Sequence, residues 1–336
     1  MAAAGPSSAS LPEPVLAFLR RSGLAAQGEA PAAQALAGGV SSDIWRVELG
    51  RATVCVKRAL PRLRTAQRWE APVERNRYER RWIETANRIV PGVAPRVLAA
   101  DDDAGCFAME YLGGLPLWKA ELAAGRADAG FARAVGERLA RIHAATAGDP
   151  GVAAEFATDA SFYAIRLEPY LVATARAHPG LAAPLEALAA RTASTRLALV
   201  HGDVSPKNIL LGPEGPVLLD AECAWYGDPA FDLAFCLNHM LLKCLWVPAA
   251  GEGFLGCFDS LYGAYLQTCS WEDPSSLESR AASLLPGLLL ARVDGKSPVE
   301  YITEASQKDR VRRVAGALIE APPARLAQVR DAWRRS

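Results

Sequence analysis

The stretch LALVHGDVSPKNILLGPEGPVLLDAEC, residues 197–223, decides the fold of this 336-residue chain. Patterns rich in Ala, Leu and Arg, typical of helices, precede it, and helical patterns resume at residue 231 and continue to the C-terminus. Between them, the stretch places two short apolar runs around a polar loop. We therefore predict short strands and a functional loop here, within a mainly helical part of the chain.

The polar loop combines residue types suited to phosphate chemistry. HGDVSPKNIL (201–210) places Asp203 two residues after a histidine and Asn208 five residues after Asp203, and Asp220 ends the apolar run of VLLDAE (217–222). Phosphoryl transfer needs one carboxylate to accept or orient the proton of an attacking hydroxyl. It also needs an amide and a second carboxylate to hold the metal that bridges the phosphates. We predict Asp203 as the catalytic base, and Asn208 and Asp220 as Mg²⁺ ligands.

The alternative interpretation of this loop is a pair of ordinary turns, which are also rich in Asp, Asn and Pro. A His-x-Asp triplet alone would not exclude that alternative. The joint pattern is more restrictive, because strand-like runs flank the loop and GDPAFDLA (227–234) follows it.

The upstream part of the chain contains a candidate phosphate loop. GGVSSDIWRVEL (38–49) begins with two glycines and two serines, Gly38, Gly39, Ser41 and Ser42. Glycine lets the backbone approach phosphate oxygens, and serine hydroxyls donate hydrogen bonds. We predict that these four residues bind the nucleotide.

A lysine follows on a predicted hairpin. IWRVEL (44–49) and ATVCVKRAL (52–60) alternate like two strands, which places Lys57 where a kinase lysine reaches the α- and β-phosphates. Such a lysine needs a carboxylate partner. The basic helical stretch at 70–89 offers four, Glu70, Glu74, Glu79 and Glu84. We predict Glu79, one helical turn beyond Arg75, with Glu74 as the second choice.

The remaining patterns predict a small β-rich lobe and a larger helical one. The first contains a helix at 14–21 and two more strands at 95–101 and 106–112. Helices of the second lobe are expected at 116–124, 129–146, 161–177 and 181–194.

Gly113-Gly114, after the last strand of the first lobe, is a natural hinge. We predict a nucleotide-binding lobe at 1–112 and a catalytic and substrate-binding lobe at 113–336. The backbone next to this hinge, at Glu110 and Leu112, is predicted to border the adenine.

Composition excludes several classes of partner. Lys and Arg number 37 and so do Asp and Glu, which gives no reason to expect nucleic acid or an anionic membrane as a partner. The seven cysteines are scattered without a C-x-x-C pair, which argues against a disulfide framework or a zinc site and favours the cytoplasm. Polar residues interrupt the longest apolar stretch, around Leu233 to Val247, and we interpret it as a buried helix.

These motifs resemble those of the aminoglycoside phosphotransferase/choline kinase superfamily, within the protein-kinase-like fold, over roughly residues 35 to 330. HGDVSPKNIL resembles its catalytic loop, and LLDAECAWYGDPAFDLA (218–234) resembles its metal-binding segment. The resemblance implies an α+β, two-lobe fold with a small antiparallel sheet and one helix in the N-lobe and a mainly helical C-lobe. It also implies ATP and Mg²⁺ as cofactors, Glu222 beside Asp220 at the metal, and Asp232 as a brace of the catalytic loop.

A closer likeness is to methylthioribose kinases. VCVKRALPRLR (54–64), RWEAPVERNRYE (68–79) and AECAWYG (221–227) resemble their lysine strand, the segment after it, and their D-x-E-x-A-x-Y-G pattern. This chain departs from them after H-G-D, where it has Ser-Pro-Lys-Asn and they have His-Thr-Gly. The departure bears on the substrate, whereas the resemblance in fold and reaction does not depend on these positions.

The acceptor is expected to be a hydroxyl of a small molecule, bound near Asp203. Arg292, in LLARVDGKSPVEY (289–301), is predicted to face it, as the resemblance to kinases with C-lobe arginines implies; a solvated helix face is the alternative. For Arg310, Arg312 and Arg313 we favour the solvated face. From residue 238 onward eleven acidic residues stand against twelve basic ones, which weighs against a polycationic acceptor and favours a neutral or anionic one such as a sugar.

Three other functions remain open at this point. An aminoglycoside O-phosphotransferase and a nucleotide-binding pseudokinase scaffold share the fold, and a protein kinase is opposed by the D-A-E segment at 220–222. The chain is expected to act as a monomer or homodimer.

Overall fold

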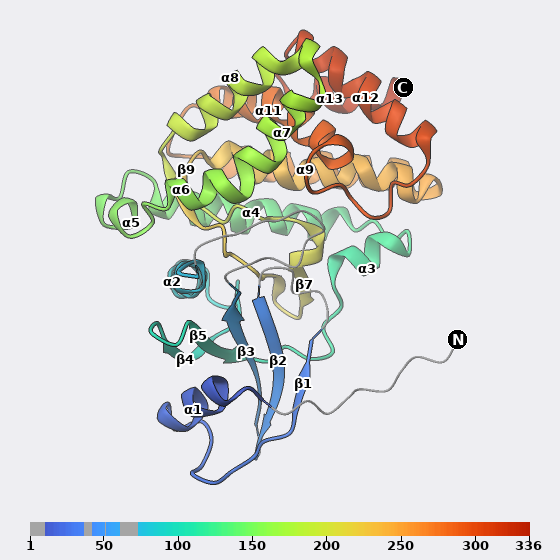
Figure 1. Cartoon of the computed structure of the whole chain (residues 1–336). Helices are drawn as coiled ribbons and strands as arrows, with labels where there is room; N and C mark the ends of the chain where they lie inside the picture. The colour runs from blue at the N-terminus through green and yellow to red at the C-terminus, as the bar shows by residue number, and fades with distance from the viewer. Residues whose placement is uncertain (1–10, 37–41, 51, 61–72) are drawn as a thin grey trace. The chain divides into compact units, whose positions relative to one another are not determined.

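The computed structural model describes residues 11–36, 42–50, 52–60 and 73–336 (Figure 1). The chain divides into two compact units. The N-terminal unit comprises the described residues up to Arg88 together with Ala94–Gly114. The C-terminal unit comprises Ile89–Val93 together with Leu115–Ser336.

The N-terminal unit is built on a five-stranded antiparallel sheet with the strand order β1-β2-β3-β5-β4. Its strands are β1 (Ala33–Ala35), β2 (Ser42–Leu49), β3 (Ala52–Ala59), β4 (Val97–Asp101) and β5 (Cys106–Glu110). The predicted hairpin is confirmed, because β2 pairs with β3 along its whole length and Lys57 lies opposite Ile44. Strand β1 was not predicted, because three residues are too few to show an alternating pattern.

Alternation along β2 gives the sheet its buried face. Trp45 and Val47 are buried, and they pack in one core with Val15 and Phe18 of helix α1 (Glu13–Arg21). Burying a side chain of this size contributes about 1.5–3 kcal/mol. The apolar spacing that predicts the helix at 14–21 therefore also attaches it to the sheet.

Helix α2 (Arg75–Ile89) is the long helix of this unit, and it ends before Pro91-Gly92 as predicted. Gly92 has a φ of 76°, a backbone conformation that favours glycine. The Asn87 side chain fixes the chain beyond the helix, donating to the Ala94 carbonyl at 3.0 Å and accepting from the Ala94 N–H at 3.2 Å.

The C-terminal unit is mainly helical. Its longer helices are α4 (Ala129–Thr146), α8 (Ala182–Ser194), α9 (Pro229–Trp246), α10 (Gly251–Thr268), α11 (Pro274–Asp294), α12 (Ala305–Glu320) and α13 (Leu326–Arg335). Shorter pieces are α3 (Trp118–Ala123), α5 (Pro150–Glu155), α6 (Asp159–Phe162), α7 (Ala173–Ala177), η2 (Pro179–Leu181) and η4 (Pro248–Ala250). Among the described residues, no helix combines the length and the apolar character needed to cross a membrane.

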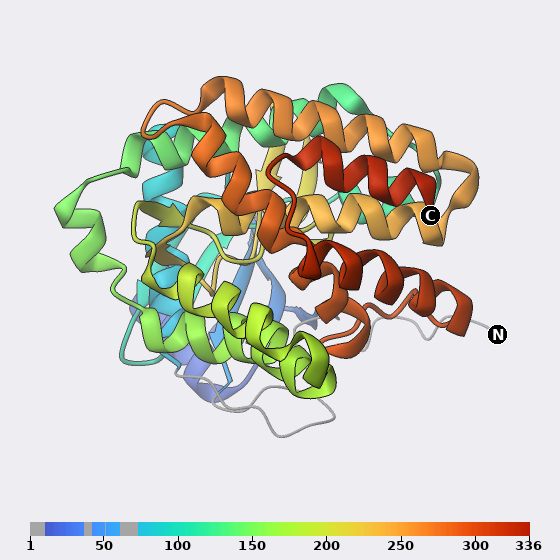
Figure 2. The same ribbon diagram turned by 90° about the horizontal axis from the view of Figure 1, so that it is seen from above.

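Helix α9 is the core of this unit. Nearly all of its residues are buried, and it packs against both α10 and α11, which in turn contact α13 (Figures 1 and 2). Helix α10 also lies on α4, where a Cβ at Gly136 would collide with the Leu261 carbonyl. Glycine is therefore required for this close helix contact. The apolar stretch around 233–247 is a buried helix, as predicted.

Two small ladders interrupt the helices where the sequence predicted short strands. β6 (Ala198–Val200) pairs with β9 (Trp225–Gly227), and β7 (Ile209–Gly212) pairs with β8 (Gly215–Leu218). The short 3-10 helix η3 (Pro206–Asn208) leads directly into β7. Residues 201–208 therefore connect β6 of the first strand pair to β7 of the second.

The helix predicted at 161–177 is irregular. Its middle is a π-helix, η1 (Tyr163–Val172), between α6 and α7. Pro169 lies inside η1 and has no N–H to donate. In the same segment the Arg166 guanidinium donates to the Ile165 carbonyl at 2.7 Å. π-helical turns are frequent at functional sites.

Candidate active site

The catalytic-loop candidate is fixed by the N-terminus of α9. The Asp232 carboxylate accepts hydrogen bonds from the N–H groups of His201, at 2.7 Å, and Gly202, at 2.8 Å. His143 Nε2 lies 3.3 Å from the same carboxylate. The bracing contact that the resemblance implies for Asp232 is therefore present, and it determines the backbone path immediately before Asp203.

Gly202 is required at its position for two reasons. Its φ is 80°, and a Cβ there would lie 2.7 Å from the Cys223 carbonyl oxygen. A larger residue would force apart the loop that contains Asp203 and the loop that contains Asp220 and Glu222. The glycine of H-G-D thus lets these two segments approach each other.

Asp203 is buried between two cations. Its Oδ2 lies 3.0 Å from an Arg166 guanidinium nitrogen and 3.0 Å from Lys207 Nζ, and its side chain is 6% exposed. Burial opposes ionisation, but the positive charges of Lys207 and Arg166 outweigh it and hold the pKa of Asp203 below its usual value. At neutral pH the carboxylate is therefore ionised and able to accept a hydrogen bond from a hydroxyl.

Asn208 and Asp220 are brought together by the second ladder. The Leu219 N–H donates to the Asn208 carbonyl at 2.8 Å, so Asp220 follows directly on the strand that neighbours Asn208. The Asn208 amide also donates to the Asp203 carbonyl at 3.1 Å. These contacts hold the three residues in one short region of the C-terminal unit.

Asp220 has an unusual backbone. Its φ is 67°, and among the described residues it is the only non-glycine residue with a positive φ. Asp tolerates this conformation better than most residues, but the conformation still carries a cost and is concentrated at functional sites. Beyond it, the Glu222 carboxylate is among the charges that raise the pKa of Arg166, although burial of that guanidinium has the opposite effect.

No three His, Cys, Asp or Glu side chains in the described part of the chain come together as a metal-binding group. The predicted ligand set has a different composition, with the amide of Asn208 and the carboxylates of Asp220 and Glu222. All three supply oxygen, which is the ligand atom that Mg²⁺ prefers.

Sequence reasoning missed Arg166. From η1 it donates to the Gly202 carbonyl at 2.5 Å and to the Ile165 carbonyl at 2.7 Å, in addition to its contact with Asp203. Its sequence context, RLEPYL, has no motif, and 36 residues separate it from Gly202. The one signal was Pro169 inside a predicted helix, which indicates a local departure from α-helical bonding. Lys207 lies within the quoted motif, but we assigned no role to it.

In the N-terminal unit, Lys57 lies beside Glu79. Lys57 Nζ is 2.9 Å from Oε1 and 2.7 Å from Oε2 of Glu79, and the two side chains are 2% and 1% exposed. Glu74, the second choice, is exposed. Removing two charges from water is costly, so a buried pair of this kind is a weak source of stability. The predicted contact is present, and its role in binding phosphates stays a prediction.

A side chain from α2 fixes the strand that contains Lys57. The Asn76 amide donates to the Lys57 carbonyl at 3.2 Å and to the Gly105 carbonyl at 2.7 Å. The helix that positions Glu79 is thus bonded to β3 and to the turn between β4 and β5. Burial raises the pKa of the neighbouring Cys55 thiol to about 12, so this thiol is not ionised near neutral pH.

The other residues predicted to bind the nucleotide belong to the proposed phosphate loop and to the end of β5. Ser42 is buried at the start of β2, whereas Gly38, Gly39 and Ser41 lie outside the described residues. Glu110 ends β5, and its carboxylate accepts from the Arg96 N–H at 2.9 Å. Leu112 follows in the connection to Gly113, half-buried.

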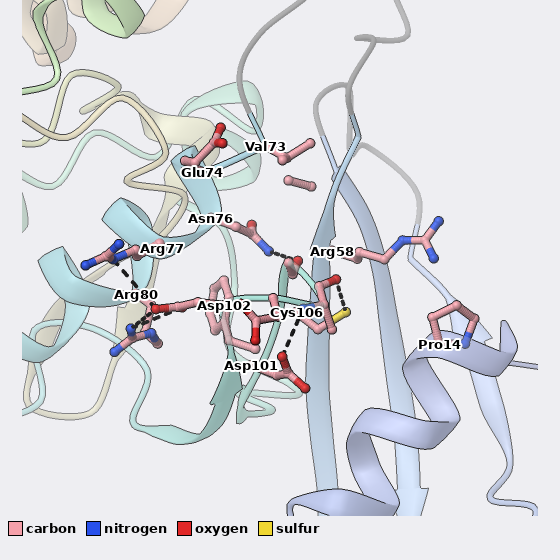
Figure 3. A pocket seen from close by; sticks show the side chains of 15 residues that line it. Pro14, Arg58, Val73, Glu74, Asn76, Arg77, Arg80, Asp101, Asp102 and Cys106 are labelled. Atoms are coloured by element: carbon pink, nitrogen blue, oxygen red, sulfur yellow. Dashed lines mark hydrogen bonds and ion pairs between the residues drawn. The ribbon is translucent and has the colours of Figure 1, made fainter.

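A pocket within the N-terminal unit is lined by charged side chains of α2 and of the turn between β4 and β5 (Figure 3). Those charges engage one another. Arg80 lies 3.2 Å from Asp102 and 3.0 Å from Glu84, and Arg77 lies 3.6 Å from Asp102. We do not assign a ligand to this pocket, because its cations are already compensated.

Arg292 does not lie on a solvated helix face. It is 8% exposed, and a guanidinium nitrogen donates to the Tyr170 hydroxyl at 2.9 Å and to the Ser297 carbonyl at 2.5 Å. In contrast, Arg313 is exposed and Arg312 pairs with Asp294 and Asp309. The solvated alternative therefore holds for these two arginines of α12 and is excluded for Arg292.

Comparison with known proteins gives a family and a fold. Residues 32–271 match the model of a family described as the phosphotransferase enzyme family. A methylthioribose kinase of Pectobacterium atrosepticum is 26% identical over 230 residues, 60% of this chain and 57% of that protein. One from an Enterobacter species is 26% identical over 239 residues, 63% of this chain and 58% of that protein. The chain thus matches less than two thirds of the length of either relative.

Among solved structures, the amicoumacin kinase hAmiN, in complex with AMP-PNP, Ca²⁺ and Ami, matches with a TM-score of 0.56 at 14% identity, over 94% of this chain and 96% of that one. This likeness shows the fold. The α+β, protein-kinase-like arrangement expected from the sequence, with an antiparallel sheet followed by a mainly helical part, is confirmed.

Proposed function

The chain belongs to the phosphotransferase enzyme family, and we propose that it transfers the γ-phosphoryl group of ATP to a hydroxyl of a small molecule. In this reaction the acceptor oxygen forms a bond to the γ-phosphorus, and the bond from that phosphorus to the bridging oxygen of ADP breaks. The acceptor proton is taken up by Asp203 or passes from it to solvent. ADP and a phosphate monoester are the products.

One observation carries this proposal, the state of Asp203. Its carboxylate is buried and ionised between Arg166 and Lys207, on a loop that Asp232 braces. A carboxylate with a lowered pKa is a weak base, but it orients an attacking hydroxyl well. In phosphoryl transfer that orientation is the main task, because catalysis depends on positioning and charge stabilisation.

Asn208, Asp220 and Glu222 fit a magnesium ion in the donors they offer and in the unusual backbone of Asp220. Magnesium is bound by one or two carboxylates together with phosphate oxygens and water. When bound, it would neutralise charge that develops on the phosphates. The left-handed conformation of Asp220, costly for a residue with only a structural role, supports this assignment.

The N-terminal unit would bind the nucleotide. We assign Lys57 to the α- and β-phosphates, with Glu79 as the residue that orients it. Gly38, Gly39, Ser41 and Ser42 remain the proposed phosphate loop, and the backbone at Glu110 and Leu112 the proposed adenine contact.

The curated relatives, both methylthioribose kinases, support a sugar as the acceptor class. An aminoglycoside acceptor is less well supported, because Asp203 is paired with the basic side chains of Arg166 and Lys207, and a further arginine, Arg292, is buried in the same unit. All seven cysteines are free thiols, which favours a reducing compartment such as the cytoplasm. We propose a monomer or homodimer.

The proposal is tested by ATP consumption in the presence of sugars, methylthioribose, choline, homoserine and aminoglycosides. We expect turnover with at least one compound, and a loss of about 10²- to 10⁴-fold in Asp203→Asn. Asp309→Asn, on the exposed face of α12, is the matched control and should keep full activity. Nucleotide binding without turnover on any compound would instead support the pseudokinase alternative.

A further inference from the structure

A group of buried cations lies in the C-terminal unit beyond Asp203. Helix α9 presents four side chains on one face at spacings of four, four and three residues, Phe235, His239, Lys243 and Trp246. Arg292 comes to this face from α11, and Tyr301 from the segment that follows it. We call His239, Lys243 and Arg292 the basic cluster.

Contacts between rings and cations connect Asp203 to the basic cluster. The Arg166 guanidinium, which contacts Asp203, lies 5.8 Å from the Tyr170 ring centre and 5.7 Å from that of Phe235. Tyr170 accepts a hydrogen bond of 2.9 Å from Arg292. The Phe235 ring is 5.7 Å from the His239 ring. The basic cluster is therefore one residue layer away from the proposed base.

Lys243 is the least compensated member. It is 1% exposed, and its Nζ lies 3.7 Å from the Tyr301 ring centre and 4.1 Å from that of Trp246, while these two rings stack 4.5 Å apart. Among the described residues, no carboxylate lies within salt-bridge distance of this Nζ. Cation–π contacts offset only part of the cost of a buried charge.

Other polar atoms in this region also lack partners. His239 Nε2, Arg292 Nε and the Tyr301 hydroxyl are buried without a hydrogen bond in the described part of the chain. Burial and the surrounding cations, Arg292 first and then Lys243, Lys207 and Lys119, lower the pKa of His239 well below its usual value. Glu300, a carboxylate whose charge acts on Lys243, is bound to Lys119. In the part of the chain that the structure describes, neither Lys243 nor Arg292 forms an ion pair with a carboxylate.

Folding alone does not account for such a site. A buried charge without a partner destabilises a fold, and an apolar side chain of similar size at position 243 would remove that cost. An anion that binds there would offset the charge of Lys243 and Arg292 and supply acceptors to the unsatisfied donors. The chemistry of the basic cluster therefore matches a carboxylate or phosphate group.

We infer that the basic cluster binds the anionic group, a carboxylate or a phosphate, of the small alcohol that the enzyme phosphorylates. This inference rests on the proposed function and narrows its acceptor class from any hydroxyl compound to an anionic one. The Trp246–Tyr301 stack would border the acceptor on the side away from Asp203. A neutral sugar would leave the cations of the cluster uncompensated.

The test compares acceptors in matched pairs, glycerate with glycerol, gluconate with glucose, and ribose 5-phosphate with ribose. We expect the anionic member of at least one pair to be phosphorylated with a kcat/KM more than ~100-fold above its neutral counterpart. Lys243→Met should raise the KM for that acceptor ~10- to 100-fold and leave the KM for ATP unchanged. Lys243→Arg should keep part of the affinity. Lys308→Met, on α12, is the matched control and should change neither constant.

Two outcomes would overturn the inference and leave the proposed kinase function intact. One is turnover confined to neutral or cationic acceptors. The other is a KM for the anionic acceptor that does not change in Lys243→Met. If no acceptor is turned over, thermal unfolding with inorganic phosphate and with sulfate decides. Stabilisation of the wild type that is lost in Lys243→Met supports the anion site, and equal shifts in both proteins reject it. Lys243→Gln replaces Lys243→Met in each arm if the latter does not fold.

Discussion

Two lysines of this protein are almost completely buried, one in each unit, and their surroundings differ. Lys57 of β3 lies 2.7 Å from the Glu79 carboxylate. Lys243 of α9 faces two aromatic rings, with Lys119 and Arg292 among the charges that lower its pKa. The first lysine has a carboxylate beside it whether or not a ligand is bound. The second retains its charge readily only when an anion is bound.

A buried lysine behaves differently with and without a carboxylate partner. A lysine paired with a carboxylate is positioned before any ligand arrives, which suits a group that must orient phosphates. A lysine without a carboxylate responds to its ligand, because its protonation and its binding are linked.

Glu79→Gln removes the carboxylate that compensates Lys57. Because breaking a buried ion pair leaves an uncompensated charge, we expect the free energy of unfolding in urea to fall by about 3–5 kcal/mol. Turnover should fall as well. Glu74→Gln, at the exposed residue just before α2, should change stability by less than about 0.5 kcal/mol. Similar losses in both variants would show that the pair does not compensate a buried charge.

Lys243 makes stability depend on pH. Burial first, and then the charges of Lys119 and Arg292, lower its pKa against the opposing charge of Glu300, with a net result of about 7. His239, on the same face, is neutral because its own pKa is lowered well below the usual value. The unfolded chain keeps the usual lysine pKa of about 10.4, so between these two values it binds more protons than the folded chain.

The folded protein should therefore gain stability as the pH rises from 7 towards 10, and lose it as the pH falls back. We expect this contribution to be about 1–2 kcal/mol between pH 7 and pH 9. It is measured as the difference in unfolding free energy between the wild type and Lys243→Met at each pH. A difference that does not vary with pH would mean that Lys243 titrates as an exposed lysine does.

Glu300→Gln should produce the smallest effect. Glu300 raises the pKa of Lys243 and holds Lys119 by an ion pair, so its removal should lower that pKa further. Since the Glu300 side chain is 67% exposed, we expect a shift of the pH profile below about one unit. The measurement compares the unfolding free energies of Glu300→Gln and of the double variant Glu300→Gln/Lys243→Met at each pH. The displacement of this profile from the one measured without Glu300→Gln gives the shift in the pKa of Lys243. An upward shift would contradict the assigned charges.

The local parts of the fold were accessible from the sequence. The alternation in 44–49 and 52–60 predicted the hairpin because neighbouring strands joined by a short turn determine each other's register. The sequence also indicated the loop that contains Asp203 and Asn208 and the apolar run that ends at Asp220. They were recognisable because the residue types and the spacings that phosphoryl transfer needs are combined in one short stretch. The bond from the Leu219 N–H to the Asn208 carbonyl explains how this spacing becomes proximity.

Other parts depend on packing between distant segments. Arg166 reaches Asp203 from a π-helix, a backbone form that residue periodicity does not distinguish from an α-helix. Lys243 was recognised only as a break in an apolar run, because its aromatic neighbour Tyr301 comes from a segment beyond α11. The choice of Glu79 over Glu74 was correct as a contact, but it rested on helical phase relative to Arg75.

The two hydrogen bonds of Asn76 have a consequence for regulation. They tie the first turn of α2 to β3 and to the turn between β4 and β5, with Glu79 one turn further along the same helix. An outward swing of α2 that separates Glu79 from Lys57, which is how related folds can be turned off, would have to break both of these bonds. The enzyme would then be always poised, and its output would follow the supply of its acceptor instead of an internal switch.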